Sequence, residues 1–147
     1  ILIAYHDFIC GFQKVIRYWL PVFIWAFIIF SFSAYPTIRT SEIQWKDFFV
    51  KKSLHIIEYA IFASLLYRAI RKEGVIGKKA ALYSIFFSVL YGLSDEFHQN
   101  FTPGREPKFR DVIFDTIGSF LAIYIIWKLL PRAHMKLKTW AKKLELK

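Results

Sequence analysis

Four apolar stretches alternate with polar segments along the chain. The clearest stretch, Tyr18 to Ile38, holds 21 uncharged residues between Arg17 and Arg39, which is long enough to cross a hydrocarbon core of roughly 30 Å. The other three are shorter, and they reach a spanning length of roughly 17 to 20 residues only if flanking acidic and histidine residues belong to the helix. Their uncharged cores are Tyr59 to Tyr67, Ala80 to Ser94 and Thr116 to Trp127. The pattern predicts an all-α membrane protein with four transmembrane helices.

Prolines, glycines and a serine suggest where these helices begin and end. We expect helices over about 18–34, 53–70, 79–97 and 111–130. Proline at positions 36 and 131 ends the first and the last helix, and Ser53 is a candidate N-cap for the second. Gly74 and Gly77 predict a turn between the second and third helices, and Pro103-Gly104 predicts a type II turn between the third and fourth.

These helices divide the chain into an N-terminal segment 1–17, a four-helix membrane domain 18–131 and a basic tail 132–147. Leu137, Trp140 and Leu144 recur at helical spacing among lysines in the tail. That pattern fits a helix on the anionic inner leaflet or, equally, a solvated basic tail.

Composition supports a membrane protein. The 147 residues are 56% hydrophobic and 20% aromatic, which is too apolar for an ordinary soluble domain. Two alternatives are a soluble bundle of short core helices and a cleaved signal peptide over the first stretch. The single cysteine, Cys10, excludes an intrachain disulfide and a thiolate metal site.

The net charge of +10 is distributed unevenly. With four spans, the N-terminus, the middle loop and the C-terminus share one side and hold fourteen of the 21 lysines and arginines. The positive-inside rule then predicts that both termini are cytoplasmic and that the acidic helix ends lie outside. This arrangement favours a lipid bilayer, and not nucleic acid, as the partner of the basic residues.

Polar and charged side chains gather at the helix ends expected on the outer side. They are Lys52, His55, Glu58, Asp95, Glu96, His98, Gln99, Arg105, Asp111 and Asp115. Three- and four-residue steps place three sets of residues in stripes on three helices, and Arg105 follows the turn between the last two helices. The stripes hold Lys51, His55 and Glu58; Asp95 with either His98 or Gln99; and Asp111 with Asp115. The stripe of Asp95 continues into Ser88 and Gly92, and that of Asp115 into Gly118 and Ala122. Small residues let membrane helices approach closely, so we expect these carboxylates to point inward.

Such a cluster is compatible with several kinds of chemistry. It can be an ion-pair network that only holds helix ends together, or it can bind a polar headgroup. A divalent metal is a further candidate cofactor, with His55, Glu58, Asp95 and His98 as candidate ligands.

Two catalytic patterns are also present in outline. Asp111-x-x-x-Asp115 has the one-turn spacing of magnesium-binding carboxylates. Asp95, Glu96 or His98 could serve as a general acid or base while Arg105 pairs with a phosphate. Three function classes stay open: a binding module, a metal-assisted hydrolase or transferase acting on a lipid-linked phosphate, and a structural or regulatory partner of another membrane protein.

Three separated motifs resemble the VanZ-like family. They are Lys52-x-x-His55-x-x-Glu58-Tyr59, the run from Ser94-Asp95-Glu96-Phe97-His98-Gln99 to Thr102-Pro103-Gly104-Arg105, and Asp111-Val112-x-x-Asp115-x-x-Gly118. The resemblance covers roughly Phe23 to Ile125. It implies a small multi-pass protein of the bacterial cell membrane, in a family named after a teicoplanin-resistance protein whose biochemical activity is undefined.

The resemblance and the polar stripes together give our leading hypothesis. An extracytoplasmic polar site, centred on Asp95, Glu96, His98 and Arg105, binds a cell-envelope amphiphile or precursor. Binding would alter envelope properties such as glycopeptide susceptibility.

Overall fold

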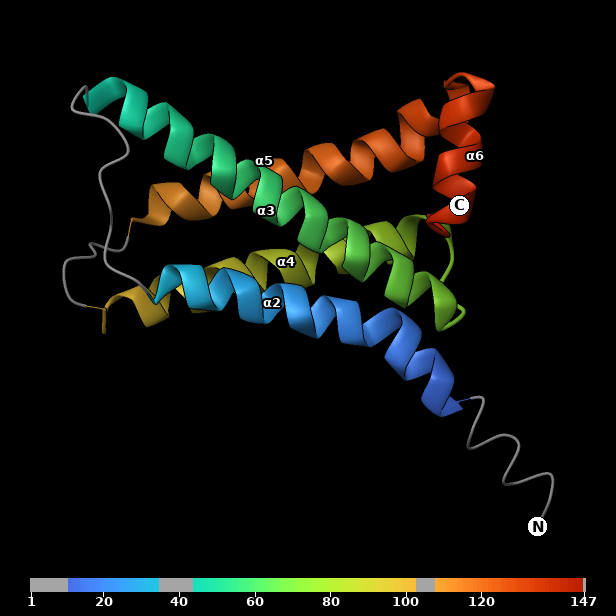
Figure 1. Cartoon of the computed structure of the whole chain (residues 1–147), viewed down its shortest axis with the longest axis horizontal. Coiled ribbons are helices and arrows are strands. Elements are labelled where there is room, and N and C mark those ends of the chain that lie inside the picture. Colours follow the sequence, from blue (N-terminus) through green and yellow to red (C-terminus); the bar gives the residue numbers. More distant parts are fainter. Residues whose placement is uncertain (1–10, 35–43, 103–107, 147) are drawn as a thin grey trace, which may run out of the picture.

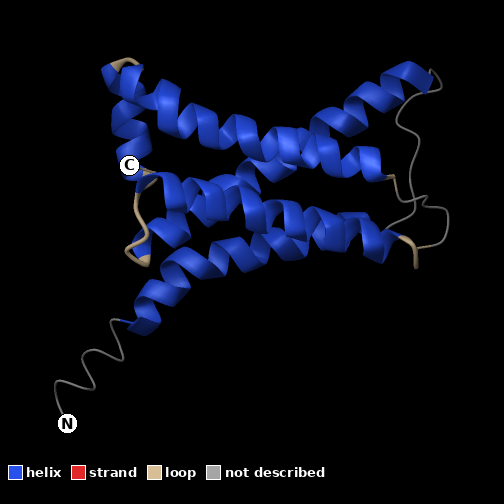
Figure 2. Cartoon of the chain, turned by 180° about the vertical axis from the view of Figure 1, so that it is seen from behind, coloured by secondary structure: helices blue, strands red, loops and turns tan. Residues whose placement is uncertain are grey.

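The computed structural model describes residues 11–34, 44–102 and 108–146, and every regular element in them is a helix (Figures 1 and 2). A first helical run, Gly11–Ser33, contains a π-helical turn η1 (Val15–Trp19) and the helix α2 (Leu20–Ser33). It is followed by α3 (Gln44–Lys72), α4 (Gly77–Gln99) and α5 (Phe109–Tyr124). A π-helical turn η2 (Ile125–Leu129), a 3₁₀ turn η3 (Leu130–Arg132) and a short helix α6 (Met135–Lys143) complete the chain. The predicted all-helical fold is confirmed.

Both π-helical turns lie just before a proline. η1 precedes Pro21, and η2 precedes Pro131. Proline has no backbone N–H and its ring clashes with the preceding turn, so the hydrogen bonds there shift register. The α-helix gives way to η2 before Pro131, which itself lies in the 3₁₀ turn η3, and the chain then leaves the bundle.

The second helix begins much earlier than its sequence suggests. α3 starts at Gln44, so Ser53 is an exposed residue inside the helix and its predicted role as N-cap is wrong. The added turns contain Phe48, whose ring meets that of Phe114 on α5 edge to face at 6.2 Å. This tertiary contact stabilises a helical extension that local sequence signals do not show.

The predicted turn between α3 and α4 is confirmed. Gly74 and Gly77 have φ angles of 87° and 59°, which favour glycine. The predicted type II turn at Pro103-Gly104 lies outside the described residues.

Helices α3, α4 and α5 pack side by side, and α2 lies against α3 and α4 (Figure 1). Small residues permit this packing. A Cβ atom on Gly118 of α5 would overlap the backbone carbonyl of Ile56 on α3, so the two helices touch backbone to backbone at this point. Between α4 and α5, the buried hydroxyls of Ser88 and Ser119 hydrogen-bond at 2.7 Å.

Three helical stretches in the described chain are long and apolar enough to cross a membrane: Gly11–Ser33, Phe48–Lys72 and Phe109–Arg132. Large apolar side chains such as Phe23 and Phe27 are 63% and 69% exposed on the outside of the bundle, as expected for a surface that faces lipid. α4 has 23 residues, but Asp95 and Glu96 near its end make it more polar. Length and apolar composition therefore indicate a membrane protein with three candidate spans.

Candidate functional site

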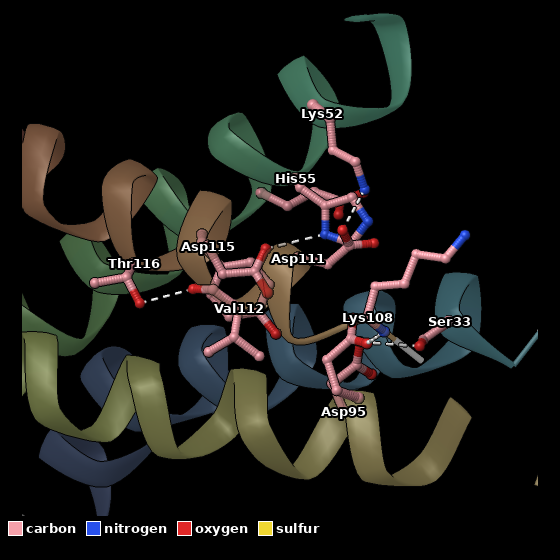
Figure 3. Close-up of polar contacts among 12 residues, drawn as sticks. Ser33, Lys52, His55, Asp95, Lys108, Asp111, Val112, Asp115 and Thr116 are labelled. Atoms are coloured by element: carbon pink, nitrogen blue, oxygen red, sulfur yellow. Dashed lines mark hydrogen bonds and ion pairs between the residues drawn. The ribbon is translucent and has the colours of Figure 1, made fainter. Parts of the chain in front are cut away.

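Segments of four helices meet at one end of the bundle. The end of α2, the first half of α3, the end of α4 and the start of α5 all lie at the left in Figure 1, opposite to α6. A close-up of this end shows side chains from these helices turned toward one another (Figure 3). We call this the polar end, and its central side chains are Ser33, Lys52, His55, Asp95, Glu96, Gln99, Asp111 and Asp115.

Lys52 and Asp111 join α3 to α5. The Lys52 Nζ and Asp111 Oδ1 atoms are 2.5 Å apart, and the two side chains are only 11% and 13% exposed. The ammonium group also lies 5.7 Å from the ring centroids of Phe48 and Phe114. Aromatic faces attract a cation and shield this ion pair from solvent.

A second α3–α5 contact lies one turn deeper. His55 Nδ1 is 3.0 Å from Asp115 Oδ1, and Asp115 is 1% exposed. The other carboxylate oxygen, Oδ2, lies beside Gly92 of α4, where an added Cβ atom would come within 3.3 Å of it. Glycine therefore leaves room on α4 for the Asp115 carboxylate.

Tyr59 approaches the same place from α3. Its side chain is fully buried, and its hydroxyl would lie 3.6 Å from a Cβ atom on Gly92. This hydroxyl finds no hydrogen-bond partner among the described residues. Buried hydroxyl groups nearly always have a partner, so the Tyr59 hydroxyl can bond to a group that the described residues do not supply.

Neutral donors hold the carboxylates of α4. Asp95 Oδ2 accepts hydrogen bonds from the Ser33 hydroxyl at 2.9 Å and from the Gln99 amide at 3.1 Å. The same Gln99 amide donates to Glu96 Oε1 at 3.3 Å, and the backbone N–H of Lys108 donates to Glu96 Oε2 at 2.8 Å. These contacts tie α4 to the end of α2 and to the start of α5.

The other predicted site residues have different surroundings. The backbone carbonyl of Glu58 accepts a hydrogen bond from the Trp25 indole at 2.9 Å. The His98 ring stacks on Phe30 at 4.2 Å, with a tilt of 36°. Arg105 lies outside the described residues.

The candidate metal ligands are not gathered into one set. Among the residues that the structure describes, no group of three or more histidine, cysteine, aspartate or glutamate side chains could hold a metal ion. Instead, His55 is paired with Asp115, Asp95 with Ser33 and Gln99, and His98 with Phe30.

Both predicted packing stripes are confirmed. Ser88, Gly92, Asp95 and Gln99 are buried along α4, and Asp111, Asp115, Gly118 and Ala122 are buried along α5. Sequence reasoning assigned no role to Ser33 or to the Tyr59 hydroxyl. Ser33 could have been found from its place, since it ends the first apolar helix on the side where the acidic ends gather.

This arrangement offers a ligand both donors and acceptors. The Tyr59 hydroxyl can donate or accept a hydrogen bond, and carboxylates accept them. The Lys52 ammonium group is already paired with Asp111, so it can meet an anionic oxygen of a ligand only as a cation shared with that carboxylate. The described residues thus suit a polar group with hydroxyl, amine or phosphate functions.

The family of the chain follows from a comparison with known family models. A family model described as VanZ/LLP1 matches residues 12–131. No curated protein and no solved structure matches the chain. The matched range includes every residue of the polar end, and we conclude that the chain belongs to the VanZ/LLP1 family.

Proposed function

We propose that this VanZ-like membrane protein crosses the membrane four times, with both termini in the cytoplasm. Its polar end then lies on the extracytoplasmic side. There it binds the polar headgroup of a cell-envelope amphiphile or precursor, and binding changes envelope properties such as susceptibility to teicoplanin. The family match and the three apolar helices support the membrane assignment.

The packing of α4 supports a fourth span. With 23 residues α4 is about 35 Å long, and it packs against both α3 and α5. A helix of that length in contact with two spanning helices crosses the bilayer with them. Its carboxylates are compatible with this position because Asp95 and Glu96 are only 4% and 6% exposed and so do not face lipid.

The distribution of basic residues supports the orientation. The turn between α3 and α4 lies at the opposite end from the polar end, as do η1 and α6 (Figure 2). Fourteen of the 21 lysines and arginines belong to the N-terminal segment, to the ends of α3 and α4 that flank this turn, and to the chain from Lys128 onward, and basic residues favour the cytoplasmic side.

One observation carries the binding proposal. Four carboxylates, Asp95, Glu96, Asp111 and Asp115, are 9% exposed or less and converge with Lys52 and His55 at one end of the bundle. Well-packed apolar side chains of similar volume are often as stabilising as buried ion pairs. Ionisable residues inside a membrane protein are by default candidates for a function.

The proposal can be tested by expressing the protein in a teicoplanin-susceptible bacterium and measuring susceptibility. Asp95→Asn removes a buried charge at the polar end, and Glu73→Gln is the matched control at the other end, where the carboxylate is 41% exposed. We expect Asp95→Asn to abolish the change in susceptibility and Glu73→Gln to retain it, at equal amounts of inserted protein.

A direct measurement accompanies the phenotype. Lipids that co-purify with each variant in mild detergent are identified by mass spectrometry. We expect one class of envelope amphiphile to co-purify with the wild type and with Glu73→Gln, but not with Asp95→Asn. If folded Asp95→Asn protein keeps both the lipid and the phenotype, the proposal is wrong.

A further inference from the structure

The C-terminal helix lies across the bundle. After Pro131 the chain turns, and α6 runs across the direction of α3, α4 and α5 at the end opposite to the polar end (Figures 1 and 2). If α2 to α5 cross a membrane, a helix in this position lies parallel to the membrane surface. The side chain of His134 accepts a hydrogen bond from the backbone of Lys136 and caps the start of this helix.

Two contacts hold α6 in this place. Glu145, just after the helix, pairs with Arg17 at 2.7 Å and with Arg68 at 3.5 Å. Ala141 is 4% exposed, and Leu146 packs against the hydrophobic core. One side of α6 is therefore fixed to the bundle, and the rest of its surface is open.

The open surface includes a row of large apolar side chains. Leu137, Trp140 and Leu144 follow three- and four-residue steps, so they share one side of the helix. They are 58%, 65% and 54% exposed, and their neighbours in the described chain leave more than half of each uncovered. Four lysines lie around this row: Lys136, Lys138, Lys142 and Lys143.

We propose that α6 is an interfacial anchor that binds a membrane surface containing anionic phospholipids. The apolar row enters the boundary between headgroups and acyl chains, and the lysines reach lipid phosphates, as in other short amphipathic helices with a basic polar face. Charge complementarity favours this occupant over a protein, and tryptophan is enriched at membrane interfaces. Lysine suits this position because its aliphatic stem can lie along apolar surface while its ammonium group stays at the level of the phosphates.

The test places a fluorescent reporter on the proposed lipid-facing side. The only cysteine, Cys10, is replaced by serine, and Leu137→Cys is labelled with an environment-sensitive dye in nanodiscs of phosphatidylglycerol and phosphatidylcholine. Thr139→Cys is the matched control, because two helical steps place it on a different side of the same helix. We expect the dye at position 137 to emit at shorter wavelength and to be quenched by nitroxide lipids, while the dye at position 139 behaves as in water.

Charge dependence is tested in the same nanodiscs. Each lysine near an anionic surface contributes about 1 kcal/mol, or about a fivefold change in the ratio of bound to released helix. Lys142→Gln should lower that ratio in anionic nanodiscs and leave it unchanged in purely phosphatidylcholine nanodiscs. The proposal is overturned if the dyes at positions 137 and 139 are equally water-exposed in anionic nanodiscs, or if the binding does not depend on lipid charge.

Discussion

The two ends of the helix bundle use charge in opposite ways. At the polar end, Asp111 and Asp115 are paired with Lys52 and His55 in surroundings that are almost closed to solvent. At the other end, which we call the basic end, the carboxylates of Glu73 and Glu145 pair with Lys14, Arg17 and Arg68. The Lys14–Glu73 pair is 40% and 41% exposed, several times more than Lys52 and Asp111.

Exposure decides what each contact contributes. An exposed ion pair is typically worth 0 to about 1 kcal/mol because water screens it. Breaking a buried pair by removing one partner costs about 3–5 kcal/mol because the other charge stays buried. We therefore expect the polar end to be sensitive to single substitutions and the basic end to tolerate them.

The largest effect should come from Gly118→Ala, which separates the helices that build the polar end. The new methyl group would lie where the carbonyl group of Ile56 is, and 2.9 Å from its Cα atom. Backbone cannot move aside like the tip of a side chain, so we expect failure to fold or a loss of more than about 3 kcal/mol. Thermal unfolding in detergent measures this. Gly11→Ala is the control, because nothing lies within 4 Å of its added Cβ; equal melting temperatures for the two variants would contradict the close α3–α5 approach.

The second largest effect concerns the Lys52–Asp111 pair. Asp111→Asn leaves the Lys52 ammonium group between two aromatic rings without its carboxylate, and we expect a loss of about 3 kcal/mol. Glu73→Gln, the corresponding change at the basic end, should cost less than about 1 kcal/mol. Chemical denaturation of both variants, with Lys52→Met and the double variant to complete a cycle, checks the comparison. Equal losses of stability in Asp111→Asn and Glu73→Gln would show that burial does not make the ion pair of the polar end more important than that of the basic end.

Much of the polar end could be predicted from the sequence because helical spacing alone determines which residues share a face. Asp95 and Asp115 lie on stripes that continue into small residues, and the structure buries both stripes. The order of the spans also predicted that these residues meet at one end. These features depend on local periodicity, which a single sequence displays.

Features that depend on distant contacts were not predictable in the same way. The start of α3 at Gln44 relies on the packing of Phe48 against Phe114, and the role of Ser33 relies on α2 and α4 ending side by side. The attachment of α6 through Glu145 joins residues 128 positions apart in the chain. No local pattern identifies the partner of such a side chain.

A smaller loss of stability should follow from removing a hydrogen bond between two helices in the middle of the bundle. Ser88→Ala removes the buried interhelical hydrogen bond to Ser119, and hydrogen bonds between membrane helices average about 0.6 kcal/mol. Ser64→Ala is the matched control, because within the described residues the Ser64 hydroxyl bonds only to the carbonyl of Ala60 on its own helix. We expect a measurable loss of stability for Ser88→Ala alone. An equally large loss for Ser64→Ala would assign the effect to the helix and not to packing between helices.

The smallest effect should be a pH dependence at the basic end. Hydrogen bonds from Lys14 and from the Trp19 indole lower the pKa of Glu73 below its ordinary value of 4.5, against a small opposing effect of burial. A carboxylate whose pKa is lower in the folded state stabilises that state fully above the ordinary pKa, and this contribution is lost as the pH falls through the lowered value. Acidification through the lowered pKa should therefore loosen the contact between η1 and the end of α3. The measurement is the protection of these amides against hydrogen exchange, relative to the intrinsic exchange rate at each pH, and we expect it to fall more in the wild type than in Glu73→Gln. Because Glu73→Gln has already lost the charge, its exchange in this region should change less with pH; identical pH profiles for the two proteins would mean that the Glu73 pair does not contribute to holding the basic end together.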